Sequence, residues 1–224
     1  MNRVIARGAA ILGVIATTSG AQGLVDKPVM VVGDRWVSRT VDLWKNEETA
    51  STESRVTSVA GDAFEIRWKT LSSVTASKVG QSGVLKGDAS TWTIENPRRV
   101  EGTYVALAFP IDVGKAWKFE YKIKNAESDY TVWKQNAKAE SWDDIRVPAG
   151  SFKSLRVVYE IGWSRTYTAP WTGGEKVISG TSTVSVWYSP EAKRVVKREW
   201  FERNSLGGMD NQGKEELVTV DVKK

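Results

Sequence analysis

Apolar and polar side chains alternate along several stretches of this chain, and this period of two constrains the fold more than any other feature. In residues 117–124, Trp117, Phe119, Tyr121 and Ile123 fall on one side and charged side chains fall on the other. Successive side chains of a β-strand point to opposite faces of a sheet, so the alternation predicts a half-buried strand. The same pattern recurs in residues 64–68, 155–163, 184–188 and 218–222.

Short turn sequences separate these predicted strands. They are rich in Gly and Pro and occupy residues 59–62, 147–150, 173–174, 189–190 and 206–208. Gly and Pro favour tight turns because of their special backbone conformations. No long amphipathic helical pattern lies between them, so the sequence predicts an all-β, antiparallel fold: a curved sheet, a half-barrel or a sandwich.

The N-terminus has the features of a cleaved signal peptide. Arg3 and Arg7 precede an apolar run over residues 9–16, and the small residues Ser19-Gly20-Ala21 follow it. The run is shorter than the roughly 20 residues that a membrane-spanning helix needs. We therefore expect a signal peptide over residues 1–21, a single domain over residues 22–224, and a periplasmic or secreted protein with no later membrane-spanning segment.

A short Val-Gly-x-x-Trp motif occurs twice, at residues 32–36 and 113–117. Each Gly permits a tight turn before a strand, and each Trp then anchors that strand in the core. The repeat suggests two similar halves, residues 22–107 and 108–224, although chance similarity is an alternative. Residues 76–103 are polar and rich in turn residues, so we expect them to form an irregular connection.

The chain lacks both histidine and cysteine, and this absence excludes many kinds of site. Without them there is no Ser-His-Asp triad, no thiolate nucleophile and no Cys- or His-based zinc site. Lipid attachment through cysteine is excluded too. The net charge of +5 is mild, and its Lys and Arg residues are interleaved with Asp and Glu, unlike the basic patch of a nucleic-acid-binding protein. We expect no catalytic residues, metal or cofactor.

Three motifs in the second half of the chain occur together in a group of exported bacterial β-rich proteins of unknown function, which this chain resembles. They read FPIDVGKAW from Phe109, VPAGSFK from Val147 and WYSPEAKRVVK from Trp187. Ile111 stands where Leu is usual, and Ser151 stands where Thr is usual. The resemblance implies an exported β-rich fold, and it implies no activity and no catalytic residues.

Aromatic side chains provide the candidate binding residues. The chain has 11 tryptophans, and most lie in predicted strands, where packing explains them. The loop over residues 162–176 is different, because its aromatic residues lie among Ser, Thr, Pro and Gly. We predict ligand contacts from Trp163, Tyr167 and Trp171 of this loop and from Trp117 and Tyr159 of the strands. An alternative is that Trp171 plugs one end of the sheet.

These observations favour a non-enzymatic exported protein that binds an apolar or amphiphilic ligand, or a partner in the cell envelope. The alternative is a carbohydrate-binding module or a carboxylate-based glycoside-active module. The glycoside-active form needs two facing carboxyl groups. Glu199 and Glu202 have opposite parity in their strand, and Asp143 and Asp144 are adjacent. Each pair should therefore point to different faces, which argues against catalysis.

Overall fold

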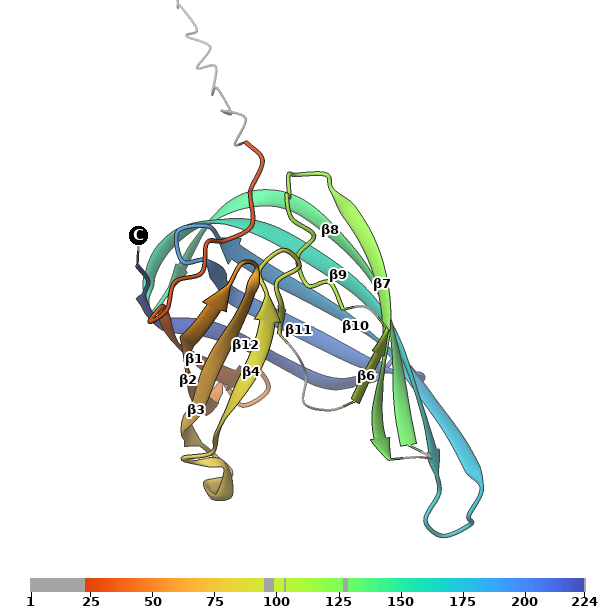
Figure 1. Cartoon of the computed structure of the whole chain (residues 1–224). Coiled ribbons are helices and arrows are strands. Elements are labelled where there is room, and N and C mark those ends of the chain that lie inside the picture. The colour runs from red at the N-terminus through yellow and green to blue at the C-terminus, as the bar shows by residue number, and fades with distance from the viewer. Residues whose placement is uncertain (1–22, 95–98, 103, 127–128, 224) are drawn as a thin grey trace, which may run out of the picture.

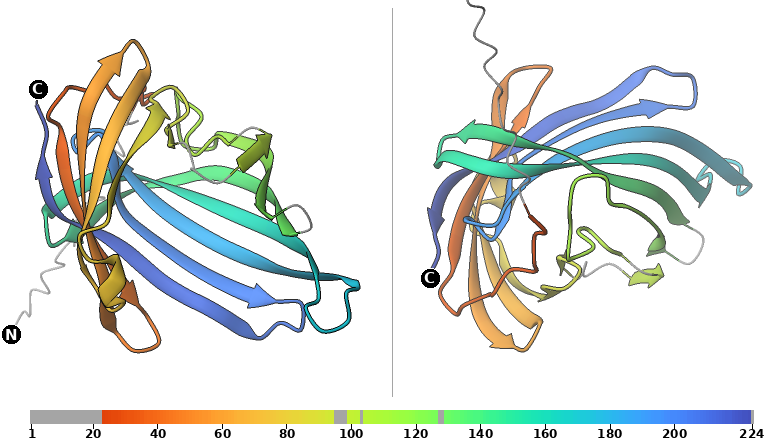
Figure 2. Two further views of the ribbon diagram at one scale, coloured as in Figure 1. Left: turned by 60° about the horizontal axis from the view of Figure 1, so that its bottom comes forward. Right: turned by 90° about the horizontal axis from the view of Figure 1, so that it is seen from above.

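The computed structural model describes residues 23–94, 99–102, 104–126 and 129–223. These residues form one antiparallel sheet of 12 strands, which is strongly curved (Figures 1 and 2). The predicted all-β, antiparallel, curved fold is confirmed. The predicted signal peptide, residues 1–21, lies outside the described residues.

The strands follow one another as a meander that is interrupted once. Their bounds are β1 Arg35–Asp42, β2 Glu47–Ala60, β3 Ala63–Ser73, β4 Ser82–Asp88, β5 Thr93–Ile94, β6 Arg99–Gly102, β7 Ala116–Ala126, β8 Asp129–Val147, β9 Gly150–Thr168, β10 Glu175–Ser189, β11 Arg194–Asn204 and β12 Met209–Asp221, with a 3-10 helix, η1, at Ala76–Lys78. Their order in the sheet is β5-β4-β3-β2-β1-β12-β11-β10-β9-β8-β7-β6. The first and last strands therefore pair in the middle of the sheet.

The two edges of the sheet are consecutive along the chain, and this connection explains the curvature. β5 ends at Ile94 on one edge, and β6 begins at Arg99 on the other. Each residue spans at most about 3.6 Å, so the five residue steps from Ile94 to Arg99 keep these two residues within about 18 Å of each other. A flat sheet of this width cannot meet that limit. The sheet instead curls into a trough, with the orange and yellow strands β1–β4 on one side and the green-to-blue strands β7–β11 on the other (Figure 2).

The residues that cover the inner face of the trough are 89–92, before β5, and 104–115, after β6 (Figures 1 and 2). Trp92 is 6% exposed, and its ring lies 6.0 Å from Phe64 and 6.3 Å from Tyr188. Leu107 is fully buried and its N–H donates to the Thr91 carbonyl. The prediction that residues 76–103 form an irregular connection is wrong, because η1, β4, β5 and β6 lie within them. Their polar side chains suit strands near a sheet edge.

Trp36 and Asp34 join the start of β1 to segments that are distant in sequence. The indole Nε1 of Trp36 donates to the Ala192 carbonyl at 2.8 Å, and Trp36 is 1% exposed. The carboxylate of Asp34 has no exposed area and accepts from the Lys193 ammonium at 3.0 Å and the Lys223 N–H at 2.8 Å. These contacts join β1 to the β10–β11 turn and to the residues after β12.

Both copies of the Val-Gly-x-x-Trp motif precede strands, and in both the glycine has a positive φ, +97° at Gly33 and +92° at Gly114. L-residues with side chains rarely adopt this conformation, so glycine is required for the turn. Trp36 is buried, whereas Trp117 is half-buried against the core. β1 lies in the middle of the sheet and β7 lies next to an edge. The division into halves, residues 22–107 and 108–224, stays a prediction.

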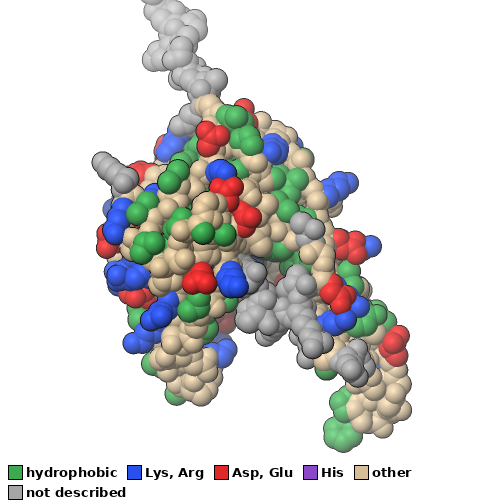
Figure 3. All heavy atoms as spheres, viewed as in Figure 1, with side chains coloured by type: hydrophobic (Ala, Val, Ile, Leu, Met, Phe, Trp, Pro, Cys, Tyr) green, Lys and Arg blue, Asp and Glu red, His purple; other side chains and the backbone are tan. Residues whose placement is uncertain are grey.

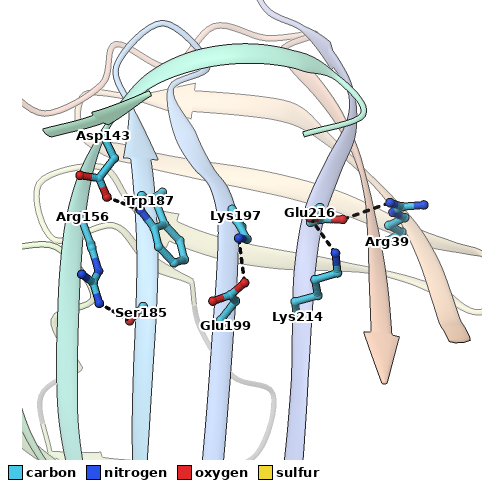
Figure 4. A network of polar contacts seen from close by, with 9 residues as sticks. All are labelled: Arg39, Asp143, Arg156, Ser185, Trp187, Lys197, Glu199, Lys214 and Glu216. Carbon is cyan, nitrogen blue, oxygen red and sulfur yellow. Dashed lines mark hydrogen bonds and ion pairs between the residues drawn. The ribbon is translucent and has the colours of Figure 1, made fainter. Parts of the chain in front are cut away.

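A row of polar contacts crosses the outer face of the sheet, the face opposite the trough (Figure 4). The strand registers align Arg156, Trp187, Lys197, Glu216 and Arg39 from β9 through β10, β11 and β12 to β1. The Trp187 ring lies 5.8 Å from the Arg156 guanidinium and 4.8 Å from the Lys197 ammonium. Cation–π contacts of this kind are worth about 0.5–2 kcal/mol. The row therefore stabilises the five central strands relative to one another.

Glu216 is the acidic member of this row, and its side chain is 8% exposed. It accepts from Lys214 at 3.0 Å and from Arg39 at 3.1 Å. Burial alone would raise the pKa of Glu216, but the hydrogen bonds and charges of Lys214 and Arg39 outweigh it and lower the pKa. The ionised carboxylate is therefore the form that stabilises the fold.

We expect Glu216→Gln to lower the free energy of unfolding at pH 7 by about 2 kcal/mol, because two charged hydrogen bonds are weakened. The folded-state pKa lies below the unfolded value, so the stabilisation is present above that unfolded value and is lost as the pH falls through the folded-state pKa. The difference between parent and variant should therefore shrink below about pH 4. Urea melts at pH 7 and pH 3 measure it.

Glu120→Gln is the matched control, because Glu120 is 58% exposed and its Lys134 partner lies 3.7 Å away. Exposed pairs contribute about 0–1 kcal/mol. Equal losses in the two variants at pH 7, or a difference for Glu216→Gln that persists at pH 3, would contradict the expectation.

Candidate ligand-binding cavity

A cavity of about 800 Å³ lies on the inner face of the sheet, between β7–β12 and the segment that covers the trough. Apolar and aromatic side chains form most of its wall. The residues that line it include Trp92, Tyr104, Tyr121, Trp133, Gln135, Tyr159, Ile161, Ser182, Val184, Arg194, Arg198, Trp200, Glu202, Asn211 and Glu215. Because strands alternate their side chains, every second residue of β9 and β10 faces this space.

Aromatic rings pack against one another along one wall of the cavity. Tyr121 stacks on Trp133 with the ring centroids 6.3 Å apart, and Tyr104 meets Tyr121 edge-to-face at 5.2 Å. Pairs with these geometries are worth about 0.5–1.5 kcal/mol beyond their buried area. The wall is therefore a rigid aromatic surface, with Trp200 on β11 in the same cavity.

The tyrosine hydroxyls add a few polar groups to this wall. The Gln135 amide donates to the Tyr121 hydroxyl at 3.1 Å, and the Tyr159 hydroxyl donates to the Ala106 carbonyl. Burial raises the pKa of Tyr104, Tyr121 and Tyr159 above 10, and the nearby positive charge of Arg198 lowers them by less. The three hydroxyls therefore stay protonated at neutral pH and can donate hydrogen bonds.

Two arginines of β11 also line the cavity. Arg198 lies beside Trp200, with 5.3 Å between its guanidinium carbon and the ring centroid. Arg194 lies over the Trp36 ring at 5.4 Å, and its buried Nη1 has no hydrogen-bond partner among the described residues. Burial lowers the pKa of Arg194, and the charge of Glu215 partly reverses this. An aromatic cavity thus contains fixed positive charge.

Among the residues predicted from sequence to bind a ligand, Tyr159 lines the cavity and two others pack beside it. Trp117 meets Tyr159 edge-to-face at 6.3 Å and donates from Nε1 to the Val105 carbonyl at 3.0 Å. Trp163 lies 6.2 Å from Trp133, which lines the cavity. Trp117 and Trp163 therefore support residues of the wall, and Trp163 continues the aromatic surface toward the β9–β10 hairpin.

Trp171 and Tyr167 lie away from the cavity, in the β9–β10 hairpin. Trp171 is 96% exposed at its tip, where hydrophobic side chains are visible in Figure 3. Tyr167 lies under the guanidinium of Arg165 at 5.5 Å. The interpretation of Trp171 as a plug for the sheet is wrong, because a plug must be buried. A contact between Trp171 and an external partner stays a prediction.

Sequence reasoning missed Arg198, Trp200 and Trp133 as cavity residues. Trp200 lies across Gly213 of β12, where an added Cβ would come within 2.2 Å of its ring. The sequence does show that every second residue of β11 is either charged or aromatic, at Arg198, Trp200 and Glu202. Because charged residues occur in this alternation, the pattern alone does not show which face of β11 is buried, and it could not identify these cavity residues.

The carboxyl groups considered for catalysis lie on different faces, as their parity predicts. Glu199 pairs with Lys197 at 2.7 Å on the outer face (Figure 4), whereas Glu202 lines the cavity. Burial and the charge of Asp210 raise the pKa of Glu202, and a hydrogen bond with Asn211 acts against them.

The described residues bring together no three acidic side chains that could hold a metal ion. Within the described ranges, no helix has the length and hydropathy that a bilayer crossing requires.

No family model and no curated protein sequence matches this chain. Solved structures with a similar fold include a putative lipoprotein from Parabacteroides distasonis, 15% identical, with a TM-score of 0.54 over 89% of this chain and 100% of that one. Another is a putative exported protein with a YmcC-like fold from Bacteroides fragilis, 14% identical, with a TM-score of 0.53 over 88% of this chain and 99% of that one. At these identities the likeness establishes the fold alone.

Proposed function

We propose that this protein is a non-enzymatic, exported binding protein that holds an apolar or amphiphilic ligand on the inner face of its sheet. The cavity carries the proposal. Its volume of about 800 Å³ lies within the range of about 300–1,000 Å³ that is typical of small-molecule sites. Its wall combines aromatic and aliphatic side chains with polar and charged groups that can orient a ligand.

Two observations support the exported location. Residues 1–21 have the charge, hydropathy and small-residue pattern of a signal peptide. The two structures with a similar fold are named as a putative lipoprotein and a putative exported protein.

The absence of His and Cys from the sequence supports a role in binding rather than catalysis.

Filling the cavity tests the proposed function. Ser182 of β10 is 7% exposed and lines the cavity, whereas the adjacent Thr183 lies on the outer face and contacts Glu160. We expect Ser182→Trp to weaken binding of the neutral apolar fluorophore N-phenylnaphthylamine by about tenfold or more, because the indole takes the space of the probe. A fluorescence titration measures the affinity.

Thr183→Trp is the control, since it adds the same side chain to the opposite face of the same strand. It should bind the fluorophore as the parent does, and so should Trp171→Ala at the distant hairpin tip. If the parent does not bind the fluorophore, or if Ser182→Trp binds it equally well while remaining folded, the cavity is not the binding site.

A further inference from the structure

Arg198 is a charged side chain in the wall of an aromatic cavity. In the part of the chain that the structure describes, its guanidinium makes no hydrogen bond and no ion pair, and its central carbon lies 5.3 Å from the centroid of the Trp200 ring. Glu202 lies two residues beyond Trp200 and also lines the cavity, yet no ion pair joins it to Arg198. Arg198 therefore has unused hydrogen-bond donors that face the cavity.

Among the other charged residues that line the cavity, Glu216 has ion-pair partners of its own. Glu216 is paired with Lys214 at 3.0 Å and with Arg39 at 3.1 Å. Glu215 lies opposite Arg198 in the β11–β12 register, yet no ion pair joins them. The charge of Glu215 acts instead on Arg194, whose pKa it raises against the effect of burial. Within the described ranges, Arg198 therefore has no ion-pair partner.

Hydroxyl donors lie within reach of the same charge. The positive charge of Arg198 acts on Tyr104, Tyr121 and Tyr159, which burial keeps protonated. The Tyr121 hydroxyl accepts from Gln135, so its own proton remains available, and the Tyr159 hydroxyl is used by the Ala106 carbonyl. A guanidinium with neighbouring hydroxyl donors is suited to a carboxylate or a phosphate, which accepts several charge-assisted hydrogen bonds.

We propose that Arg198, with the hydroxyls of Tyr104 and Tyr121, binds the anionic head group of an amphiphile whose apolar chain lies along the inner face of β9 and β10. The inference rests on the proposed function, since it names the ligand class of the same cavity. The apolar chain packs against Ile161 and Val184, both of which line the cavity. The ligand class is therefore a long-chain carboxylate or phosphate monoester.

Calorimetric titrations with dodecanoate, dodecyl phosphate and dodecanol, each below its aggregation limit, test the head group separately from the chain. We expect the parent to bind both anions about tenfold or more tightly than dodecanol, because hydrogen bonds to charged groups contribute this much. Arg198→Met should remove the preference for the anions and leave dodecanol binding unchanged. Its thermal midpoint should fall by no more than the small contribution of the cation–π contact with Trp200, the contact that the substitution removes.

Arg203→Met is the control variant. It removes the same charge from the same strand, but Arg203 is exposed and donates to the Gly207 carbonyl at the β11–β12 turn. It should keep the preference for the anions. Equal binding of the three compounds by the parent, or an unchanged preference in Arg198→Met, would overturn the role of Arg198 and leave the proposed function standing.

Two other results overturn more specific parts of the inference. Displacement of dodecyl phosphate by an equal concentration of inorganic phosphate would show a site for free anions rather than amphiphiles. Binding of none of the three compounds, together with no binding of the neutral fluorophore, would overturn the proposed function and the inference with it.

Discussion

Replacing Trp36 with alanine is expected to lower the free energy of unfolding by about 3–5 kcal/mol, as for large aromatic residues in a core. Trp36 is 1% exposed, and its Nε1 donates to the Ala192 carbonyl at 2.8 Å. The substitution removes buried apolar area. It also leaves the Ala192 carbonyl, in the β10–β11 turn, without its hydrogen-bond donor. The midpoint of a urea melt, with the slope compared to the parent, measures the loss.

Trp44→Ala is the control for this prediction, because Trp44 is 60% exposed in the turn after the same strand. It should change the free energy of unfolding by no more than about 0.5 kcal/mol, as for surface positions. Similar midpoints for the two variants would show that Trp36 does not anchor the sheet.

Asp34→Asn is expected to cost about 3–5 kcal/mol, because breaking a buried ion pair leaves the remaining charge without compensation. The side chain of Asp34 has no exposed area, and that of Lys193 is 14% exposed. Asparagine has nearly the same shape, so packing is retained while the negative charge is lost. The amide keeps an acceptor for the Lys223 N–H, but the Lys193 ammonium loses its counter-ion.

The exposed pair between Lys27 and Asp62 is the control for this prediction, with side chains 48% and 43% exposed. Asp62→Asn removes the same charge in water and should cost at most about 1 kcal/mol. Thermal melts of the two variants compare these effects directly. A small loss for Asp34→Asn, similar to that of Asp62→Asn, would mean that the buried pair contributes little to stability.

Much of the fold could be predicted from sequence because the strands follow a period of two. The predicted strands at residues 64–68, 117–124 and 155–163 lie within β3, β7 and β9. The predicted turn at residues 147–150 connects β8 to β9, and the positive φ of Gly150 shows why glycine is there. Alternation and turn chemistry are local properties of the chain, so sequence reasoning finds them.

Register shifts are the part of the fold that the pattern could not reveal. In the β1–β12 pair, the partner changes from Thr219 to Leu217 and Val218 is passed over. Val218 is therefore 37% exposed while Leu217 is 2% exposed, although the pattern places Val218 on the buried side. An inserted residue reverses the two faces of a strand, and it depends on the partner strand rather than on local sequence.

The cavity was predictable only in part, for a related reason. Tyr159 lies in the middle of residues 155–163, where every second residue is aliphatic or aromatic, so its inward direction follows from the pattern. Arg198 and Trp200 belong to β11, whose two faces both carry charged residues. The covering segment that makes the trough a cavity packs through Trp92 and Leu107, far from β11 in sequence. Only the tertiary arrangement brings these groups together.

The pairing of β1 with β12 has a consequence for how the molecule is assembled. All the other pairings join strands that are neighbours along the chain, whereas this one joins the first strand to the last at the centre of the sheet. When the chain emerges from its N-terminal end first, one side of β1 has no partner strand until β12 is available. Pairings between segments so distant in sequence form slowly. During that interval the exposed strand can pair with another chain. The middle of the sheet is therefore the last part to form, and aggregation competes with folding until it does.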